Sequence, residues 1–126
     1  MNLNHVTLPS TDLHCACAFY ARLGLKLIVD ALPRYARFEC PEGGATFSLH
    51  LTLSPVPRVE FPLVYLECPA LDAVCDELQR AGVAFESLPA DRSWLWREAR
   101  LRDPDGNALC LYWAGPNRRF PPWRVP

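Results

Sequence analysis

The sequence predicts an α+β fold made of two β-α-β-β-β modules. The predicted order of elements in the first half of the chain returns in the second half. Three helix positions recur at a constant spacing of 58 residues: Leu13 and Leu71, Cys17 and Cys75, Gly24 and Gly82. Near the C-terminus, the stretch Asp-Pro-Asp-Gly-Asn at 103–107 lies between two alternating segments, which is typical of a β-hairpin.

The first half begins with a predicted strand over residues 5–8, which Pro9 is expected to end. Apolar residues then recur at spacings of three and four, which predicts a helix to about Leu23 with Ser10 or Thr11 as its N-cap. Turns containing proline or glycine separate three further predicted strands, at 25–29, 35–40 and 45–51.

The second half repeats this order after a proline-rich linker. The predicted elements are a strand at 63–67, a helix at 71–81 and strands at 83–87, 93–102 and 108–113. We therefore expect a single domain over 1–126, divided into module one at about 1–53, the linker at 54–60, module two at about 61–114 and a C-terminal tail at 115–126. The tail is too rich in proline for a helix or a sheet, and Phe120 and Trp123 are expected to cover an apolar groove on this chain or to reach across a dimer. A disordered end is the alternative.

Three stretches together resemble the vicinal oxygen chelate (VOC) superfamily, which includes glyoxalase I, the bleomycin and fosfomycin resistance proteins and the extradiol dioxygenases. They are His5-Val6-Thr7-Leu8, residues 18–25 and the hairpin at 103–107. The resemblance implies that a helix covers one face of each sheet and that the other faces curve around a central cavity. It also implies a homodimer, because many relatives complete each cavity with a partner chain.

In metal-binding members of this superfamily, the ligands occupy positions that correspond here to His5, Ser48, Leu63 and Cys110. A divalent ion needs three or four N, O or S donors, usually with a carboxylate among them. Leu63 has no donor atom, and the Ser48 alcohol is a poor ligand. We therefore expect a degenerate metal site and no metal cofactor.

One alternative metal site stays open. His50 lies two residues beyond Ser48 and so on the same strand face, and a slip in register would bring it near His5, with the Cys110 thiolate as a third donor. A divalent metal ion at these three residues would make the protein a glyoxalase-like lyase or isomerase, or a dioxygenase. No catalytic residue follows from the sequence otherwise.

Without a metal, the lining of the cavity carries the information about function. The residues expected to line it are His5, Thr7, Ser48, His50, Leu63, Tyr65, Trp94, Trp96 and Cys110. The positions Trp94, Trp96, Glu98 and Arg100 follow one another at every second residue, so they share one face of a strand. This predicts a face that is aromatic and charged, as a site for a planar or apolar small molecule requires. The sequence thus favours binding of a small organic molecule, as in the bleomycin resistance branch. Alternatively, the tryptophans belong to the core or a dimer interface, and Cys110 is a buried structural thiol.

Composition narrows the partners and the compartment. The formal net charge is −1 and half of the residues are hydrophobic, so we expect no binding to nucleic acid or membranes, and no apolar run is long enough to span a bilayer. The six cysteines include no C-x-x-C pair, and the N-terminus does not resemble a signal peptide. These features indicate reduced cysteines in a cytoplasmic protein.

Overall fold

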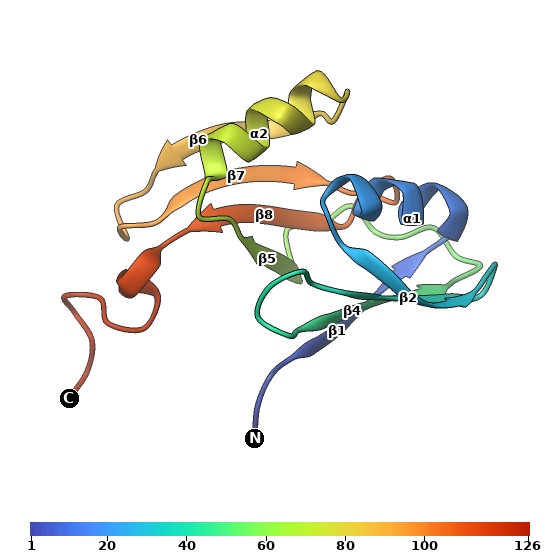
Figure 1. Ribbon diagram of the computed structural model, residues 1–126, viewed down its shortest axis with the longest axis horizontal. Helices are drawn as coiled ribbons and strands as arrows, with labels where there is room; N and C mark the ends of the chain where they lie inside the picture. Colours follow the sequence, from blue (N-terminus) through green and yellow to red (C-terminus); the bar gives the residue numbers. More distant parts are fainter. The chain divides into compact units, whose positions relative to one another are not determined.

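The structure is a computed structural model that describes residues 1–126 and divides into two compact units. The first unit comprises Met1–Val59 and Asp103–Asn107, and the second comprises Glu60–Arg102 and Ala108–Pro126. Each unit contains one four-stranded sheet and one α-helix, as Figure 1 shows in blue to green and in green to red. This architecture confirms the predicted α+β fold with two β-α-β-β-β modules.

The first unit follows the predicted order of elements. These are β1 (His5–Ser10), α1 (Leu13–Arg22), β2 (Lys26–Ala31), β3 (Tyr35–Glu39) and β4 (Thr46–Leu51). The strand order is β1-β4-β3-β2, in which β1 and β4 are parallel and the other pairs are antiparallel. One sheet face packs its apolar residues against α1, where Tyr20 contacts Phe38 and Phe47. The opposite face carries the polar residues of the alternating pattern.

Two details of this unit differ from the prediction. Asp12 caps α1 by accepting a 3.1 Å hydrogen bond from Cys15 N, so the expected cap at Ser10 or Thr11 is wrong. The Thr11 amide and hydroxyl both donate instead to Asp105 Oδ1, each at 2.8 Å. Strand β1 also continues through Pro9, because it is an edge strand and needs ladder bonds on one side only.

The turn at Asp103–Asn107 belongs to the first unit, although the strands that it joins belong to the second. The Asp103 carboxylate is 4% exposed and accepts a 2.7 Å hydrogen bond from the Tyr20 hydroxyl. It also accepts hydrogen bonds from the Asp105 amide and from the amide and side chain of Asn107. Burial, followed by the charge of Asp103, raises the pKa of Tyr20, so Tyr20 stays a neutral donor. The bond from Tyr20 attaches the turn to helix α1, and the other bonds stabilise the turn itself.

The second unit repeats the architecture of the first. Its elements are β5 (Leu63–Glu67), α2 (Leu71–Arg80), β6 (Phe85–Asp91), β7 (Arg97–Arg102), β8 (Ala108–Trp113) and the 3₁₀-helix η1 (Gly115–Arg118). The strand order is β5-β8-β7-β6, with β5 and β8 parallel. The buried residues of α2 are Leu71, Cys75 and Leu78. They cover one face of the sheet (Figure 1). The opposite face carries the residues of this unit that were predicted to line the cavity. No helix of the structure has the length and apolar character required to cross a membrane.

Strand β7 begins at Arg97, four residues later than predicted. A tight turn precedes it, in which Arg92 N donates to Trp96 O at 2.7 Å and Leu95 N donates to Arg92 O at 3.0 Å. Leu95 adopts a φ of 65°, which the sequence gives no reason to expect, because leucine rarely enters the left-handed region. This turn displaces Trp94 from the strand in which it was expected.

The C-terminal tail also differs from its prediction. Its first residues form the helix η1, where no helix was expected. Phe120 and Trp123 are 60% and 57% exposed, so they do not cover a groove on this chain as proposed. The Arg124 guanidinium lies 4.6 Å from the centroid of the Phe120 ring, a cation–π contact within the tail itself.

Candidate functional site

The predicted cavity residues fall on two sheet faces, one in each unit. In the first unit, the parallel register places Thr7 opposite Ser48. In the second unit, the parallel register places Tyr65 opposite Cys110. Thr7 and Tyr65 therefore hold equivalent positions in the two modules, as do Ser48 and Cys110.

In the first unit, a chain of hydrogen bonds runs across the face opposite α1. The His5 ring lies 2.6 Å from Thr46 Oγ1 through Nδ1 and 3.2 Å from Ser48 Oγ through Nε2. Ser48 Oγ is in turn 2.7 Å from the Tyr35 hydroxyl, which accepts a 2.8 Å bond from Arg37 Nε. The bond with Ser48, and then Arg37, lower the pKa of Tyr35, with burial acting in the opposite direction. Both nitrogens of His5 thus have partners in this network.

His50 lies on the same strand face as Ser48, as its spacing indicates, but it does not approach His5. The register pairs His5 with Thr46 and Pro9 with His50. Four residues of strand, roughly 13 Å, therefore separate the two histidines along the sheet. The His50 ring instead packs edge-on against Tyr35, with centroids 6.1 Å apart.

In the second unit, three aromatic rings cluster on the face opposite α2. Trp96 stacks on Tyr112 at a centroid distance of 4.9 Å, and Tyr65 meets both rings edge-on at 5.7 and 5.4 Å. Leu63 and Cys110 pack against the same cluster. Tyr65 is 42% exposed, so the cluster presents an aromatic surface that is open on one side.

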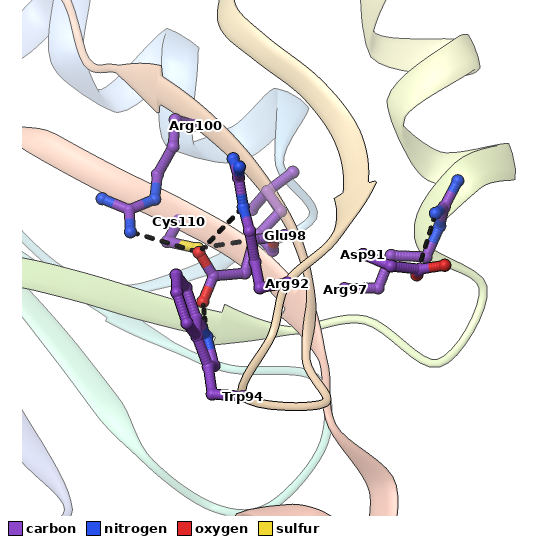
Figure 2. Close-up of polar contacts among 8 residues, drawn as sticks. Asp91, Arg92, Trp94, Arg97, Glu98, Arg100 and Cys110 are labelled. Carbon is purple, nitrogen blue, oxygen red and sulfur yellow. Dashed lines mark hydrogen bonds and ion pairs between the residues drawn. The ribbon is translucent and has the colours of Figure 1, made fainter.

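A buried carboxylate lies beside the aromatic rings. Glu98 is 0% exposed, and its Oε1 accepts a 2.8 Å hydrogen bond from the Trp94 indole. Its Oε2 accepts a 3.1 Å bond from Arg100 Nη2 and lies 3.9 Å from Arg92 Nε. Figure 2 shows these three side chains meeting at the Glu98 carboxylate. Two guanidinium groups therefore share one buried negative charge.

Cys110 lies next to Glu98 and Arg100 and has no exposed surface (Figure 2). Burial, followed by the charge of Glu98, raises the pKa of the Cys110 thiol to about 12, although a hydrogen bond with Arg100 opposes the shift. At neutral pH the side chain is therefore a neutral thiol and not a thiolate. Such a group is a weak nucleophile and a weak metal ligand.

We therefore expect Cys110 to resist alkylation. Iodoacetamide at pH 8 should modify the exposed Cys15 within minutes and leave Cys110 unmodified, because the reagent reacts with an accessible thiolate. Peptide mass spectrometry of the folded protein checks this result. A urea-unfolded sample, in which both cysteines should react, provides the control. Equal labelling of the two residues in the folded protein would contradict the burial and the raised pKa.

A cavity of about 510 Å³ opens at the end of the same sheet. Its walls come from the turn before β7 and from the segment that follows β8, and they include Arg92, Leu95, Trp96, Trp113 and Pro116. This volume lies in the range of small-molecule sites. Trp96 is the residue that this cavity shares with the aromatic cluster.

The four positions where the resemblance implies metal ligands do not fit a metal ion. Ser48 Oγ is engaged with Tyr35 and His5, Leu63 has no donor atom, and Cys110 carries a neutral thiol. No group of three or more His, Cys, Asp or Glu side chains is placed to hold a metal ion. Of the alternative trio of His5, His50 and Cys110, the two histidines do not approach each other within the first unit.

Several residues of these two faces were absent from the predicted cavity lining. Tyr35 and Arg37 complete the network of the first unit, and Tyr112 and Arg92 contribute to the second. The sequence predicts that Glu98 shares a strand face with Trp94 and Trp96, but it does not predict that Glu98 is buried. Arg92 lies in a turn, where no sequence pattern indicates in which direction a side chain points.

Comparisons with known proteins agree with this architecture. Among solved structures, a glyoxalase/bleomycin resistance protein/dioxygenase from Nocardioides superposes with a TM-score of 0.74 at 23% identity, covering 100% of this chain and 90% of that chain. A bleomycin resistance determinant encoded on the transposon Tn5 gives a TM-score of 0.75 at 21% identity, with coverages of 90% and 98%. Lactoylglutathione lyase from Agrobacterium tumefaciens gives 0.70 at 19% identity, with coverages of 88% and 92%.

These likenesses establish the fold. No curated protein matches the chain. The family model of the Glyoxalase/Bleomycin resistance protein/Dioxygenase superfamily matches residues 2–111, which is most of the sequence. The chain therefore belongs to the Glyoxalase/Bleomycin resistance protein/Dioxygenase superfamily.

Proposed function

We propose that the protein binds a small organic molecule, without covalent chemistry and without a protein-held metal, on the open face of the second sheet. The observation that carries this proposal is the position of Trp96. Trp96 lines the 510 Å³ cavity, and its ring also stacks on Tyr112 in the aromatic cluster that the exposed Tyr65 completes. An apolar ring system can thus bury one side against Trp96 and Tyr65, while Arg92 and Arg100 offer hydrogen-bond donors nearby.

The similarity to the transposon-encoded bleomycin resistance determinant supports sequestration as the outcome of binding, because that protein is described as a resistance determinant. The similarity to a lactoylglutathione lyase provides the rival function. The chemistry of the donors favours the first function. Leu63 and the neutral Cys110 thiol hold two of the four positions at which catalytic members place ligands. The homodimer expected for a member of this superfamily stays a prediction.

The uncharged probe N-phenyl-1-naphthylamine, whose fluorescence rises in apolar sites, tests the proposal. We expect saturable binding to the wild type and a roughly tenfold weaker affinity for Trp96→Ala. A tenfold loss corresponds to about 1.4 kcal/mol, of which the aromatic contact contributes about 1 kcal/mol beyond its buried area and the lost apolar area contributes the rest. Fluorescence titration at constant ionic strength gives both dissociation constants.

Trp123→Ala is the matched control, because it also removes one tryptophan but from the exposed tail. This variant should bind the probe like the wild type, and treatment with EDTA should leave binding to the wild type unchanged. The proposal fails if the wild type shows no saturable binding, or if Trp123→Ala weakens the binding of the probe as much as Trp96→Ala does. A loss of binding on chelation, restored by a divalent ion, would favour the metal-dependent rival.

A further inference from the structure

The charged groups on the open face of the second sheet do not balance. Glu98 carries one buried negative charge, whereas Arg92 and Arg100 both lie against it. Two further arginines of this unit form ion pairs, Arg102 with Glu86 and Arg118 with Glu67. One positive charge is therefore left over at Glu98.

Two further carboxylates of this unit, Asp72 and Asp91, both bind Arg97, and their side chains are 62% and 84% exposed. Figure 2 shows the pair of Asp91 and Arg97 beside the Glu98 group. Water and salt screen such exposed carboxylates strongly. They therefore do little to offset the positive charge that remains beside the buried Glu98.

The hydrogen bonding of Arg100 is also incomplete. A guanidinium has five N–H donors. In Arg100, Nη2 donates to the Glu98 carboxylate at 3.1 Å. Arg100 Nε is buried and has no hydrogen-bond partner at all. A buried donor without a partner is unfavourable, and native structures rarely contain one without a reason.

The orientation of Arg100 is fixed while its donors remain available. Its pairing with the rigid Glu98 holds the guanidinium on the sheet, and its side chain keeps 30% of its surface exposed. Arg100 and Cys110 are direct partners across β7 and β8, and Tyr65 pairs with Cys110 on the other side. A positive, partly unsatisfied guanidinium therefore lies within two strands of the exposed Tyr65 ring.

From these observations we infer that the molecule bound on this face carries an anionic group, a carboxylate or sulfonate, attached to a planar aromatic body, and that Arg100 binds the anionic group. This inference rests on the proposed function, because it names the chemical class of the ligand for the same face. The aromatic body lies against Tyr65 and Trp96. The anion accepts hydrogen bonds from the exposed part of the Arg100 guanidinium and neutralises the remaining positive charge.

Two probes with the same ring system test the inference. The anion 8-anilino-1-naphthalenesulfonate and the uncharged N-phenyl-1-naphthylamine differ by one sulfonate. The substitution Arg100→Gln should weaken the affinity for the sulfonate probe at least about tenfold, since hydrogen bonds to charged groups are the strong ones. It should change the affinity for the uncharged probe less than about twofold. Arg100→Lys keeps the charge but loses the planar donor array, so it should give an intermediate affinity for the sulfonate.

Arg102→Gln is the matched control, because it removes a positive charge two residues along the same strand from an arginine that already pairs with Glu86. It should leave both affinities unchanged, and thermal melts identify any variant that does not fold. The inference is wrong if Arg100→Gln and Arg100→Lys weaken both probes equally, or if Arg102→Gln weakens the sulfonate as much. If the wild type binds neither probe, the proposed function fails and the inference with it. Binding of the uncharged probe alone would overturn only the inference.

Discussion

Asp103→Ala is expected to lower the free energy of unfolding by about 3–5 kcal/mol, because several donors share its buried carboxylate and hydrogen bonds to a charged group contribute more than neutral ones. The carboxylate accepts hydrogen bonds from the Tyr20 hydroxyl, the Asp105 amide and both donors of Asn107. In the variant, the buried Tyr20 hydroxyl loses its acceptor, and the turn loses its attachment to helix α1. Urea unfolding followed by circular dichroism measures the change.

Tyr20→Phe separates the two contributions. It removes one of the four hydrogen bonds and keeps the carboxylate with its three others, so its cost should be about 1–2 kcal/mol. In a double variant, Tyr20→Phe should add little to Asp103→Ala, because the hydroxyl has then already lost its partner. If Asp103→Ala costs no more than Tyr20→Phe, the carboxylate does not organise the turn.

This turn illustrates what the sequence could predict and what it could not. The pattern at 103–107 predicts a hairpin, and the hairpin is present because Gly106 supplies a positive φ of 91°. The contact with Tyr20 joins residues 83 positions apart, and no local pattern contains it. Thr11 shows the same distance effect, because its amide and hydroxyl both donate to Asp105, a partner 94 positions away that no local pattern contains.

Strand faces were predictable wherever the alternation is regular. Phe47 and Leu49 face helix α1 while Ser48 and His50 face away, and strand β5 has the predicted bounds. Alternation failed before β7, where the left-handed Leu95 turns the chain. The pattern gives the side of a sheet on which a residue lies, but burial depends on neighbours from other segments.

Glu98 is the clearest case of this limit. The stretch at 97–102 contains three arginines and one glutamate, which is typical of a solvated strand, yet Glu98 has no exposed surface. Its burial depends on Trp94 and Arg92, which reach it from the irregular turn before the strand. A sequence pattern that repeats every two residues cannot report such a contact.

Glu98→Ala is therefore expected to lower the free energy of unfolding by about 1.5–3 kcal/mol, because the buried carboxylate accepts hydrogen bonds from Arg100 and Trp94 and hydrogen bonds to charged groups are the strong ones. Two guanidinium groups and the Trp94 indole would lose their common acceptor. Glu98→Gln keeps the shape and an acceptor for Trp94 but loses the charge, so its cost should be smaller. Urea unfolding monitored by tryptophan fluorescence provides the free energies.

Glu86→Ala is the matched control, because it also removes a glutamate that pairs with an arginine of β7, but from a side chain that is 46% exposed. Its expected cost is below about 1 kcal/mol, as for other exposed pairs. A similar cost for Glu98→Ala would mean that water reaches the carboxylate, so that Arg92 and Arg100 would not need it. The charge argument for an anionic ligand would then lose its basis, because a solvated Glu98 would no longer hold Arg100 in place.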